Sequence, residues 1–151
     1  MKHWLMKTEP DAFSIDDLER VGTEPWTGVR NYQARNFMRQ MKPGDPVLFY
    51  HSSCKVPGVY GLAEVATVPY PDPTQFDRKS PYHDPKSTRE QPRWELVDVR
   101  FVRRLEPPVT LATLREHAED LEGLKLLERG SRLSVQPVTP HQYRRILALS
   151  R

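Results

Sequence analysis

The order of the predicted strands and helices restricts the folds open to this chain more than any other feature of its sequence. Residues 47–51 form a continuous apolar run of strand length, which is typical of a strand buried on both faces. Residues 59–65 follow a turn at Pro57-Gly58 as a neighbouring strand, and residues 94–102 alternate in polarity like a strand. Because the strands cluster in mid-chain and do not alternate with helices, the sequence predicts an α+β domain with a curved or barrel-like sheet and helices at the connections.

Helices are predicted where a capping residue precedes an apolar repeat. Ser14 and Asp17 have the spacing of a capping box, and residues 139–142 repeat this pattern with a proline at the first helical position. Apolar residues within 34–41 recur at helical spacing, which indicates an amphipathic helix. Thr110 is predicted to cap a further helix, and short strands are predicted at residues 4–6 and 132–138.

Length, charge and cysteine content limit the partners and the cellular setting. A chain of 151 residues is expected to form one domain over residues 1–151. Its net charge of +3 permits a nucleic-acid partner without requiring one. Cys54 is the single cysteine, so neither an intramolecular disulfide nor a thiolate zinc cluster can form. With no pattern of a signal peptide or membrane span, we expect no membrane association and a cytoplasmic location, or a nuclear one in a eukaryote.

Residues 69–93 stand apart because they contain six prolines and show little periodicity. A loop of this length inside a compact domain is uncommon and is often functional. Aromatic residues, among them Phe76 and Tyr82, are interleaved there with basic ones, a composition that suits a nucleic-acid surface. An inert insertion held by its prolines is an equally open interpretation.

The sequence contains no motif that supports catalysis, metal binding or a cofactor. It has no HExxH, GxSxG, P-loop or GxGxxG pattern, and its five histidines lack the spacing of metal ligands. His51 and Cys54 lie three residues apart at a predicted strand end, but a hydrogen-bonded histidine and a structural or incidental cysteine are the simpler interpretation. We therefore predict no enzymatic activity. The alternatives are an enzyme acting on nucleotides or nucleic acid through this pair, and a module for small-molecule or protein interaction.

The stretch WTGVRNYQARNFM at residues 26–38 places a large aromatic residue among hydrogen-bond donors just before a predicted helix. Trp26 taken alone is more often a core residue than a pocket wall. Gly28 allows close approach, and the helix already supplies apolar core, which favours the pocket. Asn31 suits two roles equally well, the N-cap of the helix and a hydrogen-bonding partner of a base edge.

Several motifs, in order along the chain, resemble those of one family. They are WLMKTEP at 4–10, WTGVRNYQARNFM at 26–38, GDPVLFYHSSCK at 44–55, PYPDPTQFD at 69–77, DPKS at 84–87, PRW at 92–94 and GSRLSVQPV at 130–138. Together they resemble the EVE domain family over nearly the whole chain, about residues 2–147. Thr8 and Thr27 depart from the family, which often has Ser and Asp at these positions.

The resemblance implies a PUA-like fold, a small curved β-barrel with helices at the connections. Related domains include YTH domains, which bind methylated adenine in RNA, and SRA domains, which flip methylated cytosine out of DNA. The resemblance therefore implies a non-catalytic nucleic-acid-binding domain that reads a modified base in an aromatic-lined pocket. Modified cytosine in DNA, as 5-methylcytosine or 5-hydroxymethylcytosine, is the favoured target, and RNA is the other.

The resemblance also assigns residues to the expected site. With it included, Trp26 is expected to line the base pocket, and either Tyr70 or Phe76 to form a second aromatic wall. The expected base pocket comprises Lys7, Thr8, Trp26, Val29, Arg30, Asn31, Tyr32, Tyr50, His51, Ser52, Phe76, Arg132 and Ser134. Contacts to phosphate are expected from Arg30, Arg35, Arg39, Arg78, Lys79, Lys86 and Arg89.

Overall fold

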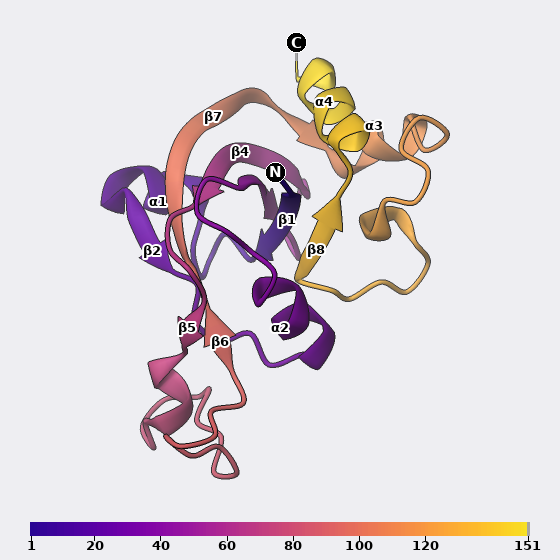
Figure 1. Ribbon diagram of the computed structural model, residues 1–151. Coiled ribbons are helices and arrows are strands. Elements are labelled where there is room, and N and C mark those ends of the chain that lie inside the picture. Colours follow the sequence, from indigo (N-terminus) through magenta and orange to yellow (C-terminus); the bar gives the residue numbers. More distant parts are fainter. Residues whose placement is uncertain (151) are drawn as a thin grey trace.

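The molecule is built around a strongly curled six-stranded sheet with the strand order β2-β7-β4-β3-β1-β8 (Figure 1). The computed structural model describes residues 1–150. The strands are β1 (His3–Thr8), β2 (Thr23–Pro25), β3 (Pro46–His51), β4 (Gly58–Val65), β5 (Tyr70–Pro71), β6 (Glu95–Leu96), β7 (Asp98–Thr110) and β8 (Val135–Val138). The helices are α1 (Ile15–Val21), α2 (Tyr32–Met38), α3 (Leu111–Glu116) and α4 (Pro140–Leu149), with short 3-10 helices η1 (Pro73–Phe76) and η2 (Lys125–Leu127). The predicted α+β class with a curved, barrel-like sheet and helices at the connections is confirmed.

The central strands are buried on both faces because their side chains alternate between two hydrophobic clusters. Along β1, Trp4 and Met6 enter one cluster, whereas Leu5 enters the other. Strand β3 runs parallel to β1 and repeats the pattern, with Phe49 on the first side and Leu48 on the second. This alternation explains the continuous apolar run at residues 47–51 and confirms that the strand is buried on both faces.

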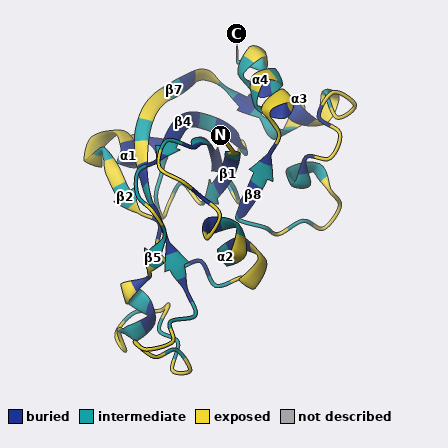
Figure 2. Ribbon diagram, in the orientation of Figure 1, coloured by how far each residue is buried: buried dark blue, intermediate teal, exposed yellow. Residues whose placement is uncertain are grey.

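The helices cover the two faces of the sheet in pairs. Helices α1 and α2 supply Leu18 and Met38 to the first cluster. Helices α3 and α4 supply Leu114 and Ile146 to the second. Their outer sides are exposed, as Figure 2 shows for α1 and α4. None of the helices in residues 1–150 has the length and apolar character that crossing a membrane requires.

Each of the four α-helices begins at a side-chain cap. Ser14 and Thr139 both form complete capping boxes, in which the third helical residue also bonds back to the cap. Thr110 and Asn31 accept a hydrogen bond from the third helical backbone N–H. The caps predicted at Ser14, Thr110 and Thr139 are therefore confirmed, and Asn31 fills the first of its two expected roles.

The strand predicted at residues 94–102 is longer than expected and is divided in two. Strand β6 pairs with β5 in a separate ribbon, and β7 continues for 13 residues to Thr110. Pro107 and Pro108 lie where the register between β4 and β7 shifts. Proline cannot donate to a strand ladder, so two prolines in a row argue against a strand when the sequence alone is considered. In the structure the irregular register accommodates them.

The proline-rich segment 69–93 projects from the sheet beyond the β5–β6 ribbon, at the bottom of Figure 1. Its two ends are tied together by the buried side chain of Gln75. The amide nitrogen of Gln75 donates to the backbone oxygens of Asp72 and Trp94. Its oxygen accepts from the backbone N–H groups of Arg93 and Trp94. With its donor and acceptor both engaged, this buried amide gives the segment a defined backbone path.

Candidate functional site

A cavity of about 430 Å³ lies at the carboxyl end of β1, beside the loop between β2 and α2. Its walls come from segments far apart in the sequence, including the turn after β1, the end of β2 and the projecting segment. The lining residues are Lys7, Thr8, Glu9, Ala12, Phe13, Glu24, Pro25, Trp26, Thr27, Gly28, Val29, Arg30, Asn31, Tyr82 and Ser134. We call it the Trp26 cavity.

Trp26 belongs both to the hydrophobic core and to the cavity wall. Its ring packs at right angles to those of Phe13 and Phe49, with centroid separations of 6.5 and 5.7 Å. Only 8% of the residue is exposed, and it lines the cavity. Most of the ring is therefore core, as the simpler interpretation held, while its remaining surface borders the cavity.

Tyr82, from the projecting segment, lines the cavity as a further aromatic residue beside Trp26 and Phe13. Its ring lies directly on Gly28, where a Cβ atom would approach Tyr82 Cζ to 2.7 Å. Gly28 also has a φ of 88°, a region that favours glycine. Neither Tyr70 nor Phe76 lines the cavity. The ring centroid of Phe76 instead lies 4.7 Å from the guanidinium carbon of Arg89. The aromatic residues that line the cavity together with Trp26 are thus Phe13 and Tyr82, and neither Tyr70 nor Phe76.

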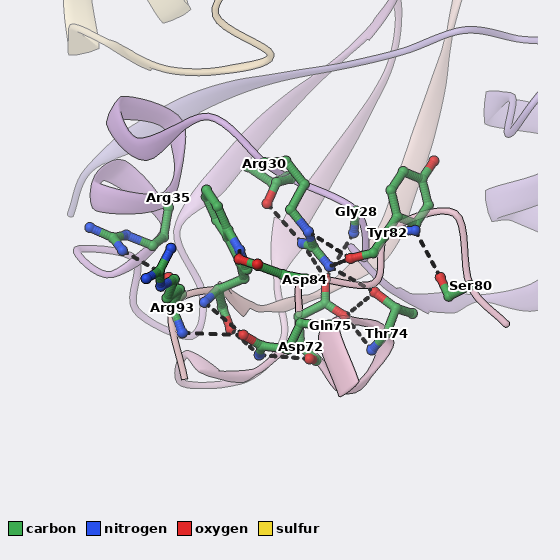
Figure 3. Close-up of polar contacts among 12 residues, drawn as sticks. Gly28, Arg30, Arg35, Asp72, Thr74, Gln75, Ser80, Tyr82, Asp84 and Arg93 are labelled. Carbon is green, nitrogen blue, oxygen red and sulfur yellow. Dashed lines mark hydrogen bonds and ion pairs between the residues drawn. The ribbon is translucent and has the colours of Figure 1, made fainter. Parts of the chain in front are cut away.

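A buried carboxylate holds the projecting segment against the β2–α2 loop (Figure 3). Asp72 Oδ2 accepts from the backbone N–H of Gly28 at 2.9 Å and from Arg30 Nη1 at 3.1 Å. Asp72 Oδ1 accepts from the backbone N–H and the hydroxyl of Thr74, at 2.8 and 2.6 Å. Burial alone would raise the pKa of Asp72, but these hydrogen bonds outweigh it and hold the pKa below its ordinary value. The charged carboxylate therefore fixes the two loops to each other.

Arg30 completes this connection. Its Nε and Nη2 both donate to the backbone oxygen of Tyr82, at 3.0 and 2.7 Å. Nη1 also donates to the backbone oxygen of Val29, and Nη2 to the Thr74 hydroxyl. All five guanidinium N–H donors thus have partners within the protein. Arg30 lines the cavity and positions Tyr82, but a contact from Arg30 to phosphate would rest on its charge alone.

Charges of both signs surround the Trp26 cavity. Lys7 and Arg30 line it together with Glu9 and Glu24. Burial, with smaller contributions from nearby carboxylates, raises the pKa of Glu24. Burial also lowers the pKa of Lys7. With aromatic walls and both donors and acceptors, the cavity suits a neutral polar ring better than an anion.

The structure brings together some of the residues expected in the base pocket and separates others. Those that line the Trp26 cavity are Lys7, Thr8, Trp26, Val29, Arg30, Asn31 and Ser134, and those that do not are Tyr32, Tyr50, His51, Ser52, Phe76 and Arg132. Strand alternation explains part of this division. Tyr50 packs into the second hydrophobic cluster, on one face of the sheet, whereas Trp26 belongs to the first cluster on the other face. Tyr50 and Ser52 line a second cavity, of about 420 Å³, which Lys7 also borders.

His51 is buried, and its Nε2 and its ring both have partners within the protein. Its Nε2 accepts from the backbone N–H of Ile15 at 3.1 Å, and its ring stacks on Tyr60 with centroids 4.1 Å apart. Burial lowers the pKa of His51, and an acceptor at Nε2 requires the neutral ring. That nitrogen is therefore not free to activate Cys54. Within residues 1–150, no three His, Cys, Asp or Glu side chains are grouped to hold a metal ion.

The basic residues expected to contact phosphate fall into two groups. Arg39 forms an ion pair with Glu95, and Arg35 donates to the backbone oxygen of Arg93 at 2.8 Å. These two arginines therefore also help to hold the base of the projecting segment. The remaining four outside the cavity, Arg78, Lys79, Lys86 and Arg89, are exposed on that segment.

Phe13, Glu24 and Tyr82 line the Trp26 cavity but were missed by sequence reasoning. The aromatic content of residues 69–93 pointed toward Tyr82, yet nothing local indicates that this segment folds back on Gly28. Glu24 reaches the cavity only because β2 pairs with β7. Such placements depend on partners distant in the sequence, so no local sequence pattern predicts them.

Comparison with known proteins agrees with the fold and with the motifs. The family model described as EVE domain matches residues 2–149. Human thymocyte nuclear protein 1 is 42% identical over 165 residues, which covers 97% of this chain and 73% of the human protein. A crystal structure of a Pseudomonas putida protein superposes with a TM-score of 0.96 at 50% identity and covers 99% of both chains. Human THYN1, solved in complex with 5-methylcytosine-containing DNA, gives a TM-score of 0.95 at 42% identity and covers 99% of this chain and 98% of that one.

The likeness in fold extends beyond these relatives. An ASCH protein from Zymomonas mobilis superposes with a TM-score of 0.54 at 12% identity, which shows a shared fold alone. The family match, in contrast, covers nearly all of this chain and is accompanied by the motifs at residues 4–10, 26–38 and 130–138. This chain belongs to the EVE domain family.

Proposed function

We propose that this protein is a non-catalytic reader of a modified base in DNA, with modified cytosine as the favoured target, and that the base enters the Trp26 cavity. The observation that carries the proposal is the cavity itself, which has aromatic and polar walls and a volume of about 430 Å³. Sites for small organic ligands typically have roughly 300–1,000 Å³. The complex of the human relative with 5-methylcytosine-containing DNA supports DNA as the class of ligand.

Aromatic contact offsets the cost of taking a base out of its stack. Extrusion costs a few kcal/mol, whereas stacking on an aromatic side chain contributes roughly 1–3 kcal/mol per base. Trp26 exposes little of its ring and contributes at the low end, while Tyr82 is 43% exposed and offers more contact surface. Both residues act on any base, because every base has an aromatic face.

Polar groups in the cavity select the type of base. One methyl group is worth only about 0.8 kcal/mol in an apolar pocket, or about fourfold in affinity. A buried polar group left unpaired costs about 1–3 kcal/mol, so a mismatched base edge is rejected more strongly than a missing methyl group. The Glu24 carboxylate suits an exocyclic amino group such as N4 of cytosine. Thr8 and the amide nitrogen of Asn31, whose oxygen caps α2, supply further partners.

Contacts to the DNA backbone come, in this proposal, from the exposed cations of the projecting segment, which are Arg78, Lys79, Lys86 and Arg89. Such contacts set the affinity and its dependence on salt but carry no information about the base. Arg35 and Arg39 add positive charge nearby, and Arg30 positions Tyr82. Affinity and base choice are thereby assigned to different residues.

The proposal is tested by filling the cavity without disturbing the core. Ala12 is exposed and lines the Trp26 cavity, so Ala12→Leu adds volume there without removing a packed side chain. Ala148 is exposed on α4, outside the cavity lining, and Ala148→Leu is the matched control. Fluorescence anisotropy at low salt measures binding to short single- and double-stranded oligonucleotides, either plain or modified at cytosine.

We expect the wild-type protein and Ala148→Leu to prefer the modified oligonucleotide. Ala12→Leu should lose about tenfold in affinity, together with most of the preference, because the base no longer reaches its aromatic walls. Equal binding of plain and modified oligonucleotides by all three proteins would contradict the proposal. Tight binding of a free nucleoside, with no gain from attached phosphates, would favour a small-molecule module instead.

A further inference from the structure

The second cavity lies at the same end of β1 and β3 as the Trp26 cavity but on the other face of these strands. Lys7 borders both cavities, whereas Tyr50, its partner in the strand register, lines only the second. The hydroxyl-bearing residues Ser52, Ser53 and Ser131 also line it. The two cavities are therefore neighbours, joined through one lysine.

Positive charge dominates the second cavity. Lys7, Arg115 and Arg129 line it with a single carboxylate, that of Glu128. Within residues 1–150, none of these three cations forms an ion pair. Unpaired cations around a concave surface create a local positive potential that attracts an anion.

A hydroxyl without a partner in the protein is a second, independent feature of this cavity. Tyr50 is 2% exposed and lines the cavity, and its hydroxyl forms no hydrogen bond with any of residues 1–150. Burial raises the pKa of Tyr50 to about 12, so the hydroxyl remains a donor at neutral pH. Because no group of the protein accepts from this hydroxyl, it is available to donate to a ligand in the cavity.

We infer that the second cavity binds a phosphate group, with the Tyr50 hydroxyl and the three cations as its donors. A phosphate group offers several acceptor oxygens at once and balances the unpaired charge. Because Lys7 joins the two cavities, the expected source is the phosphodiester that flanks a base held beside Trp26, and in this respect the inference rests on the function proposed above. Free phosphate or a mononucleotide is the other source of the same chemistry.

Two conservative variants probe this site. Tyr50→Phe removes only a hydroxyl that has no partner within residues 1–150, so the unfolding midpoint should not fall. Tyr143→Phe is its control, since Tyr143 is a half-buried tyrosine that packs against His3 and lines neither cavity. Arg129→Gln removes one of the cations, and Arg103→Gln, at an exposed position of β7, is its control.

The first experiment titrates inorganic phosphate into the protein at low ionic strength and follows backbone amide signals by NMR. We expect phosphate to shift the signals of Ser52, Ser53 and Ser131 while leaving those of Thr27 and Gly28, beside the Trp26 cavity, in place. Tyr50→Phe should weaken phosphate binding about tenfold, because it loses a hydrogen bond to a charged group. Shifts of similar size around both cavities would show non-specific binding and count against the site.

The second experiment measures oligonucleotide affinity as a function of salt concentration. Tyr50→Phe and Arg129→Gln should weaken binding to plain and modified DNA by the same factor, because a phosphate contact carries no base information. Arg129→Gln should also reduce the slope of log affinity against log salt by about one. Tyr143→Phe and Arg103→Gln should leave both the affinity and the slope unchanged.

The two experiments separate failure of this site from failure of the proposed function. If DNA binding is sensitive to Ala12→Leu but all four new variants behave like the wild type in both experiments, the phosphate site is wrong and the proposed function stands. If phosphate shifts the second cavity while no oligonucleotide binds, the site stands as one for free phosphate or a mononucleotide. Absence of phosphate shifts together with unchanged DNA binding by Tyr50→Phe and Arg129→Gln overturns the inference.

Discussion

The two cavities at the end of β1 and β3 differ in charge and in the support of their walls. The Trp26 cavity combines aromatic residues with cations and carboxylates, whereas the second cavity contains three cations without ion-pair partners in residues 1–150 and one carboxylate. The first suits a neutral ring with polar edges, and the second suits an anion. The two faces at the end of these strands therefore carry cavities suited to different ligands. The reason is that successive side chains of a strand point to opposite faces of the sheet.

The supports of the cavities differ as well. The Trp26 cavity depends on a projecting segment that Asp72 anchors to the β2–α2 loop. The second cavity is framed by the end of β3, by α3 and by residues 126–131. Changes to the anchor should therefore affect one cavity and spare the other, which gives a direct way to test whether the two are independent.

The largest effect is expected from Trp26→Ala, because this ring packs against Phe13 and Phe49. Removal of a buried aromatic side chain typically costs about 3–5 kcal/mol of unfolding free energy, which urea denaturation measures. Loss of DNA binding by this variant would report damage to the core as much as a lost contact, so Ala12→Leu remains the cleaner test of the cavity. A loss below about 1 kcal/mol would contradict the core role of the ring.

A smaller loss of stability, about 2–4 kcal/mol, is expected from Asp72→Asn, because the charged acceptor of Gly28, Arg30 and Thr74 is lost. Hydrogen exchange should become faster in residues 69–93 and at Gly28. Phosphate shifts at the second cavity should remain as in the wild type, and Asp11→Asn, at an exposed position, should change neither property. Simultaneous loss of both cavities would show that they are not independent.

The stability difference between the wild type and Asp72→Asn should also depend on pH. Because the folded-state pKa of Asp72 is lowered, its stabilising contribution is complete above the unfolded value of 3.8 and is lost as the pH falls through the folded pKa. Urea midpoints of the two proteins should therefore keep a constant separation at neutral pH and converge in acid below about pH 4. A separation that grew in acid would contradict the assigned role of this carboxylate.

The smallest effect on stability is expected from Glu24→Gln. Burial raises the folded-state pKa of Glu24, so the protonated carboxyl group favours the folded state and the ionised one disfavours it. The stabilisation by the protonated form is therefore lost as the pH rises through the folded-state pKa. The substitution should therefore leave the unfolding free energy at pH 7 unchanged or raise it by less than about 1 kcal/mol, which the thermal midpoint reports. Competition binding should show a weaker preference for cytosine, since a charged, acceptor-only carboxylate is replaced by a neutral amide that carries one acceptor and a competing donor. Glu116→Gln, exposed on α3, is the control and should change neither measurement.

The parts of the fold that depend on near neighbours in the sequence were predictable. The caps at Ser14, Thr110 and Thr139 join residues three apart, so their hydrogen bonds can be recognised from spacing alone. The strand at residues 47–51 was recognised because burial on both faces leaves no polar position in most of the run. The extension of β7 was not recognised, because most of its later residues are charged or proline and lie beside an irregular register.

The candidate site was predictable only in part. Trp26, Thr8 and Asn31 do line one cavity, as their motifs indicated. Tyr50 and Ser52, which were expected in the same pocket, line the second cavity instead, because the sheet separates the two cavities. The wall formed by Tyr82 could not be foreseen, since its place depends on hydrogen bonds from Arg30 across 52 residues of chain.

The sequence by itself determined the helix caps, the apolar faces of the central strands and membership of the EVE domain family, because these are carried by spacing and by motifs in order. Only the tertiary structure decided which polar side chains share a cavity. The physical reason is that this depends on strand register and on contacts such as the hydrogen bond from Gly28 to Asp72, which joins residues 44 positions apart.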